Sequence, residues 1–106
     1  MSEIPTGEKR RHPRIIVSIN VDWGFTTDCE QHARLTSISA GGCFMQTPDE
    51  VRPDEQIFIR LCLPETHLLR GEVRYHMPAV GFGLKFIGLT IEDQLMLEAL
   101  IASYGK

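Results

Sequence analysis

The sequence predicts a mainly β fold, a small six-stranded antiparallel barrel followed by one C-terminal α-helix. Two observations carry this prediction. Between residues 15 and 86, apolar and polar residues alternate with a period of two in several short runs that turn residues separate. After Gly88 the apolar residues recur with helical spacing instead. A chain of 106 residues, 42% of them hydrophobic, is long enough to bury a core as a single domain.

The strongest strand pattern covers residues 15–25. Every odd-numbered residue from Ile15 to Phe25 is apolar, whereas the even-numbered residues are polar or glycine, with the exception of Ile16. This alternation places one face of a strand against the core and the other toward water. The polar residues 26–31 then predict a turn.

Two shorter strands are expected at residues 32–38 and 42–47, because the segment Ser39-Ala40-Gly41-Gly42 between them has the composition of a turn. The loop that follows contains two Pro-Asp-Glu segments, which are typical of turns. Three further alternating runs complete the predicted sheet, at residues 57–63, 69–75 and 82–86.

The last segment predicts the helix. Thr90 is a suitable N-cap, and Asp93 three residues later completes a capping-box pattern. Gly105 stands where a C-terminal cap is expected. A broad apolar stripe with helical spacing consists of Ile91, Leu95, Met96, Leu97, Leu100 and Ile101. We expect its residues Leu97, Leu100 and Ile101 to pack in the core or on a partner protein rather than to bind a cofactor.

The ends and the cysteines indicate a cytoplasmic protein. Residues 1–8 are polar and are expected to be a flexible lead-in to one domain over residues 9–104. No segment has the apolar run of a signal peptide or of a membrane helix. The three cysteines lack CxxC spacing and are expected to stay reduced, with Cys43 and Cys62 as small buried or half-buried residues. Neither they nor the four histidines show the spacing of metal ligands.

The charge distribution argues against a protein that wraps a long nucleic acid. Residues 1–14 carry four basic and two acidic residues, a net charge of +2, whereas the rest carries seven basic and twelve acidic residues, a net charge of −5. Nucleic-acid-binding domains usually present a broad basic face. A positive charge confined to one short segment favours a small anionic target, or a solvated basic tail.

Two segments could carry chemistry. In Lys9-Arg10-Arg11-His12-Pro13-Arg14, two arginines four residues apart precede the first strand, and the planar guanidinium suits phosphates and guanine edges. In Thr36-Ser37-Ile38-Ser39-Ala40-Gly41-Gly42, two hydroxyls would share one face if the strand continued. A glycine there allows a positive φ or a close approach of the backbone. The simpler interpretation of this second segment is an ordinary hairpin turn.

Together the two segments resemble the PilZ domain family, whose signature is RxxxR followed by [D/N]xSxxG. Here the signature reads Arg10-x-x-x-Arg14 and Ser37-x-Ser39-x-x-Gly42. The segment Gly81-Phe82-Gly83-Leu84-Lys85-Phe86 is similar to the last strand of that family. The resemblance covers residues 8 to about 104, nearly the whole chain.

The resemblance implies a bacterial receptor for the second messenger cyclic di-GMP, bound singly or as a stacked pair, and it implies no other cofactor. Arg10 and Arg14 would bind its phosphates and guanine edges. The other implied ligand contacts are Ser37, Ser39 and Gly42 on the barrel and Lys9 and Arg11 in the basic segment. An arginine arm that becomes ordered on binding would signal to an effector protein. The receptor would be a monomer or a ligand-dependent dimer.

Ser37 departs from the family signature, which has Asp or Asn at this position. A carboxylate can accept two hydrogen bonds from a guanine edge, whereas a serine hydroxyl offers one weaker acceptor. The alternative function is therefore a PilZ-like adaptor that binds no ligand and keeps a protein-binding surface. A barrel that binds single-stranded nucleic acid is less well supported, because aromatic residues make up only 8% of the chain. No catalytic constellation is evident, so an enzyme is not expected.

Overall fold

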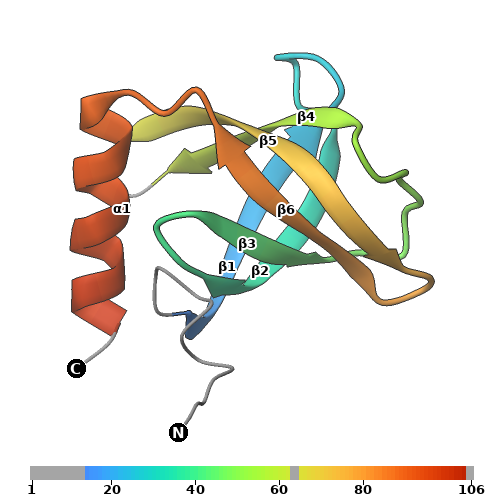
Figure 1. Cartoon of the computed structure of the whole chain (residues 1–106), viewed down its shortest axis with the longest axis horizontal. Coiled ribbons are helices and arrows are strands. Elements are labelled where there is room, and N and C mark those ends of the chain that lie inside the picture. The colour runs from blue at the N-terminus through green and yellow to red at the C-terminus, as the bar shows by residue number, and fades with distance from the viewer. Residues whose placement is uncertain (1–13, 63–64, 105–106) are drawn as a thin grey trace, which may run out of the picture.

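The computed structural model describes residues 14–62 and 65–104, which form a small barrel with a helix at one end (Figure 1). The strands pair in the order β1-β2-β3-β6-β5-β4, and β4 pairs with β1 to close the barrel. All the pairs are antiparallel. The elements are β1 (Ile15–Gly24), β2 (Gln31–Ile38), β3 (Gly42–Gln46), β4 (Gln56–Cys62), β5 (Thr66–Met77), β6 (Gly81–Ile87) and α1 (Ile91–Tyr104). The predicted six-stranded barrel and C-terminal helix are confirmed.

The barrel interior is the hydrophobic core, as the alternation predicts. From β1 it receives Val17, Ile19, Val21 and Trp23, all buried. The predicted burial is wrong for one residue after the end of β1 and one residue at the end of β4. Phe25 lies beyond the end of β1 and is exposed, and Cys62, predicted to be buried or half-buried, is exposed. In β4 the odd-numbered side chains are the buried ones, so the even-numbered Cys62 points outward.

A β-bulge in β2 shapes the sheet next to the predicted turn. Leu35 pairs with Met45 of β3, whereas Ser37 pairs with Phe44, so β2 has one extra residue, Thr36, between these pairs. Leu35 and Ile38 lie three residues apart, yet both are completely buried. An unbroken strand would send them to opposite faces, and the bulge allows both to reach the core.

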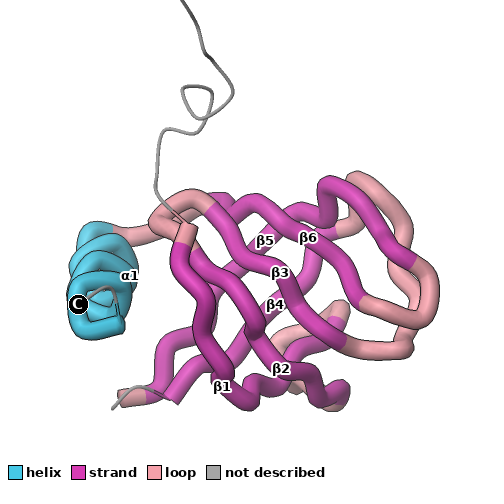
Figure 2. Tube along the Cα trace, turned by 90° about the horizontal axis from the view of Figure 1, so that it is seen from below, coloured by secondary structure: helices cyan, strands magenta, loops and turns pink. Residues whose placement is uncertain are grey.

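Helix α1 lies beside one end of the barrel and packs on it through one face (Figure 2). Leu97 and Leu100 are buried. Ile101 packs against the core beside them, so the stripe of Leu97, Leu100 and Ile101 lies in the core as expected, whereas Ile91 and Leu95 are 74% and 60% exposed. These two side chains lie on the helix face turned away from the barrel, because a helix exposes the face opposite its contact. The proposed cap Gly105 lies outside the described residues.

The predicted capping box is present. The Asp93 backbone N–H donates to Thr90 Oγ1 at 3.0 Å, and the Thr90 N–H donates to Asp93 Oδ2 at 3.1 Å. Asp93 Oδ1 also lies 3.4 Å from His67 Nδ1 of β5. The first turn of the helix is thus stabilised by its own capping hydrogen bonds and by a contact with the barrel. Among the described residues, α1 is too short to span a bilayer.

Candidate functional site

The pairing of β1 with β2 brings Arg14, the last residue of the first predicted segment, to the same edge of the barrel as the second predicted segment. Ile15 pairs with Ile38 and Ile16 with Ser37. Arg14 immediately precedes this paired region and is exposed. The turn after Ile38 contains Ser39 and leads into β3. One cationic side chain therefore lies beside the strand end and turn that the sequence singled out. Lys9, Arg10 and Arg11 lie outside the described residues.

The Ser39 hydroxyl organises the turn between β2 and β3. The N–H groups of Gly41 and Gly42 both lie 3.2 Å from Ser39 Oγ, and Ser39 Oγ lies 3.4 Å from the Gly42 carbonyl oxygen. The Ser39 N–H donates to the same carbonyl at 2.8 Å. Because β2 ends at Ile38, the condition for Ser37 and Ser39 to share a strand face is not met. The buried Ser39 hydroxyl acts first as a brace for this turn.

Gly42 permits a close approach between β3 and β6. A Cβ atom at this position would lie 2.2 Å from the carbonyl oxygen of Leu84, far inside van der Waals contact. Gly42 does not have a positive φ, so of the two reasons for a glycine here, the close approach is the one that applies. The Gly41 carbonyl accepts a hydrogen bond of 2.9 Å from the Phe86 N–H. The turn is thus held on β6 as well.

Ser37 lies on the outer side of the bulge and is half-buried. It is flanked across the sheet by Ile16 of β1 and Phe44 of β3. The sequence does not by itself point to Phe44 as a neighbour of the site. Its position opposite Ser37 follows from how β2 and β3 pair next to the turn, where Ile38 lies opposite Cys43. Beyond the bulge the register shifts by one residue, so that Leu35 pairs with Met45.

The positive charge of Arg14 affects the pKa of a buried thiol next to the turn. Cys43 of β3 pairs with Ile38 and is completely buried. Burial raises the pKa of the Cys43 thiol, and the positive charge of Arg14 acts in the opposite direction. The guanidinium therefore lies within Coulombic range of the first residues of β3. A buried thiol with a raised pKa is inert rather than nucleophilic.

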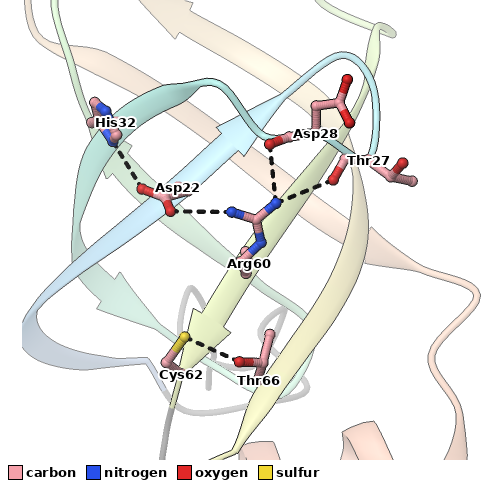
Figure 3. A network of polar contacts seen from close by, with 7 residues as sticks. All are labelled: Asp22, Thr27, Asp28, His32, Arg60, Cys62 and Thr66. Atoms are coloured by element: carbon pink, nitrogen blue, oxygen red, sulfur yellow. Dashed lines mark hydrogen bonds and ion pairs between the residues drawn. The ribbon is translucent and has the colours of Figure 1, made fainter.

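A second polar cluster lies away from the turn, around the loop that joins β1 to β2 (Figure 3). Asp22 accepts from Arg60 at 3.3 Å and lies 2.8 Å from His32 Nδ1. Arg60 also donates to the carbonyl oxygens of Thr27 and Asp28, at 3.3 and 3.0 Å. These contacts join β1, β2 and β4 and fix the loop. The role of this polar cluster is therefore to stabilise the loop between β1 and β2.

Metal-ligating groupings are not found within the described ranges 14–62 and 65–104: no three of the His, Cys, Asp and Glu side chains there could hold an ion. The described cysteines are free thiols, Cys29 and Cys43 buried and Cys62 exposed. Burial also raises the pKa of Cys29. The polar chemistry of the candidate site therefore rests on arginine, serine and backbone groups.

The described residues thus form a closed antiparallel barrel with a cationic residue, Arg14, and a serine-braced turn at one edge. The model of the PilZ domain family matches residues 8–103. This match spans most of the chain, and the chain belongs to the PilZ domain family. Comparison with curated protein sequences gave no match.

Several solved structures share this fold at low sequence identity. The PilZ domain of Escherichia coli YcgR with c-di-GMP has a TM-score of 0.74 at 14% identity, over 92% of both chains. The Klebsiella pneumoniae MrkH–c-di-GMP complex has a TM-score of 0.71 at 17% identity, over 89% of this chain and 51% of that chain. The Bacillus subtilis inhibitor of motility, MotI/DgrA, has a TM-score of 0.70 at 22% identity, over 95% and 56%. The present chain thus spans about half of MrkH and of MotI.

Proposed function

We propose that this protein is a receptor for cyclic di-GMP. The observation that carries the proposal is the pairing of β1 with β2, which brings exposed Arg14 beside Ser37 and the Ser39–Gly42 turn, the two halves of the PilZ signature. Structures of YcgR and MrkH, which share the fold, are described as complexes with c-di-GMP. In this proposal the receptor domain covers residues 9–104, and residues 1–8 precede it.

The proposed contacts divide between charge and shape. Arg10 and Arg14 bind the phosphates and the guanine edges through charge-assisted hydrogen bonds, and Lys9 and Arg11 add positive charge. Ser37 accepts from a guanine edge, as the only signature position on the outer face of β2. Ser39 and Gly42 contribute by fixing the turn, because the Ser39 hydroxyl is already bonded within it.

The proposed output is a change of shape in the arginine segment. Binding of a compact dianion orders the segment over the barrel, and an effector protein reads the ordered surface. A hollow of about 290 Å³ lies between Ala40 of the turn and Leu89, Gln94 and Glu98 in and just before α1, so the turn has open space on its helix side. A receptor of this kind acts in the bacterial cytoplasm, as a monomer or as a ligand-dependent dimer.

Isothermal titration calorimetry of the purified protein with cyclic di-GMP at physiological salt tests the proposal. Linear pGpG and GTP serve as controls, because they present guanine and phosphate without the cyclic geometry. We expect selective binding at micromolar affinity or better, and the stoichiometry distinguishes one ligand from a stacked pair. Absence of both heat and NMR shifts at saturating ligand would refute the receptor function.

Ser37 supports a second candidate, an adaptor that binds protein and no nucleotide. Serine at the Asp/Asn position of the signature removes a bidentate acceptor for a guanine edge. Such an adaptor would use its barrel and helix surfaces alone. It gives no amide shifts with cyclic di-GMP in a two-dimensional NMR spectrum, whereas a receptor gives shifts that centre on the Ser39–Gly42 turn.

A further inference from the structure

One row of the outer barrel surface joins the candidate site to a pair of aromatic rings. Across the sheet, Ile16 pairs with Ser37, Ser37 with Phe44, Phe44 with Gly83, and Gly83 with Tyr75. The row crosses β1, β2, β3, β6 and β5, which lie side by side (Figure 1). A residue adjacent in sequence to each of the three central positions faces the core and is buried: Ile38 next to Ser37, Cys43 next to Phe44, and Leu84 next to Gly83. The row itself therefore faces outward.

Tyr75 lies against the sheet where Gly83 leaves room for it. A Cβ atom on Gly83 would lie 2.4 Å from Cζ, 2.5 Å from Cε2 and 2.7 Å from the hydroxyl oxygen of Tyr75. The phenol ring thus covers the glycine directly, yet Tyr75 is 42% exposed. The ring therefore rests on β6 while part of its surface stays exposed to solvent.

Phe44 extends this surface toward Ser37. Its ring is stacked with that of Tyr75, with the centroids 6.1 Å apart and the planes 29° from parallel. Phe44 is half-buried and adjoins Ser37 in the register. Three strand spacings, roughly 14 Å, separate Ser37 from Tyr75. A ligand with two planar bases can therefore contact the signature turn with one part and the aromatic pair with another.

Two further observations favour a planar anionic ligand on this surface. Lys85 is exposed and pairs with Gly42, so a cation lies on the same outer face, two residues along β6 from Gly83. Ile16, at the β1 end of the row, is 86% exposed. Aromatic cover of a sheet glycine is also a way to stabilise a sheet. That role explains why Tyr75 packs on Gly83, but it requires neither the stacked Phe44 nor their position beside Ser37.

We propose that Phe44 and Tyr75 form a stacking platform for a guanine base of the bound cyclic dinucleotide. The inference rests on the proposed receptor function and adds residues outside the family signature. Stacking on an aromatic ring compensates for the weaker hydrogen bonding of Ser37, because it needs no acceptor on the protein. The platform holds one base while the arginine segment and the turn hold the phosphates and the other base.

The test combines calorimetry with proton NMR on the full chain. In Tyr75→Leu, which keeps apolar cover over Gly83, we expect roughly 5- to 150-fold weaker binding of cyclic di-GMP, the range of one lost base stack. Tyr75→Phe keeps the ring and should bind within about twofold of the parent protein. Met77→Leu is the matched control, because Met77 is an exposed residue of the same strand in another row. Its affinity should not change.

The H8 proton of the bound guanine gives a second readout. Stacking on an aromatic ring shifts this proton upfield in the parent protein and in Tyr75→Phe, and Phe44→Leu reduces the shift even if Tyr75→Leu fails to fold. Binding by the parent without an upfield shift, together with Leu variants of unchanged affinity, would overturn the platform and leave the receptor function standing. Absence of any binding by the parent would overturn both.

Discussion

Arg14 precedes the strand pair that carries Ser37, and its side chain is exposed. A hydrogen bond to a charged group contributes ~1.5–3 kcal/mol, so Arg14→Ala should weaken binding of cyclic di-GMP by roughly tenfold or more. Its melting temperature should stay close to that of the parent, because an exposed arginine adds little to stability. Arg10→Ala should behave alike.

Calorimetry measures the affinity of these variants and thermal unfolding their melting temperature, and Arg34→Ala is the control for both. Arg34 is also an exposed arginine, but it pairs with Asn20 and Gln46, in a row of the sheet beyond the bulge from Ser37. Its removal lowers the positive charge equally and should leave affinity almost unchanged. Equal losses for Arg14→Ala and Arg34→Ala would mean that net charge, rather than a site, attracts the ligand.

Ser37 offers a gain-of-function prediction. Ser37→Asp restores the carboxylate of the family signature on the outer face of β2, and a bidentate contact to a guanine edge is worth ~1–3 kcal/mol. We therefore expect cyclic di-GMP to bind roughly 5- to 150-fold more tightly in calorimetry. Ser18→Asp places the same charge on an exposed position of β1 and should weaken binding slightly or not at all. Unchanged affinity in Ser37→Asp would show that Ser37 does not occupy the acceptor position.

At the scale of elements, the positions of the strands could be predicted from the sequence, whereas the register in which neighbouring strands pair could not. The alternation in β1 and β4 fixed which side chains enter the core, because period two has one meaning in a half-buried strand. The extra residue at Thr36 could not be foreseen, since a bulge depends on how β2 meets both of its neighbours. The consequence for the site is large. The bulge lets Leu35 and Ile38 both face the core while Ser37 between them faces outward, and the turn, rather than the strand, holds Ser39.

The helix illustrates a related limit. Its start was predictable, because a capping box is a local pattern of two side chains and two backbone N–H groups. Its contact face of Leu97, Leu100 and Ile101 was also expected, but whether this face meets the barrel or a partner protein was left open, because only the tertiary structure places the barrel beside it. Composition gives the apolar residues of a helix, whereas tertiary contact selects which of them are covered.

The capping box gives a prediction about stability alone. Thr90→Ala removes the hydroxyl that accepts from the Asp93 N–H at 3.0 Å, and loss of such an N-cap costs about 1 kcal/mol. Urea unfolding followed by circular dichroism should show this decrease in the free energy of unfolding. Thr90→Ser keeps the acceptor and should unfold close to the parent. A Thr90→Ala midpoint equal to that of the parent would mean that the His67 contact, rather than the cap, holds the helix start.

For the molecule as a whole, closure of the barrel unites features that the sequence presents separately. Three features lie far apart in the chain: Arg14, the Ser-x-Ser-x-x-Gly turn with Phe44 just after it, and Tyr75 of β5. The strand order β1-β2-β3-β6-β5-β4 makes them neighbours on one outer surface. The signature could be recognised from two short segments, because family spacing is a property of sequence. The aromatic part required the topology, since Phe44 and Tyr75 meet only through β6.

The cysteines allow ligand binding to be measured through the stability of the whole fold. Cys43 is buried inside the barrel and burial raises its pKa, so a thiol reagent should reach it only when the barrel opens, whereas exposed Cys62 should react in the native protein. A ligand that binds the folded state at 100 times its dissociation constant stabilises that state by about 2.7 kcal/mol, or roughly 100-fold. Saturating cyclic di-GMP should therefore slow alkylation of Cys43 by up to about 100-fold, as peptide mass spectrometry would record.

Cys62 is the internal control in the same sample, because its reaction does not require unfolding and its rate should not change. Linear pGpG at the same concentration controls for non-specific stabilisation. Slowing of Cys43 alone, and only by the cyclic ligand, is the expected result, because binding to the native state protects every buried group that opens with the barrel. Equal rates with and without ligand would contradict binding to the folded barrel. Slowing of both cysteines would indicate a general effect on the reagent.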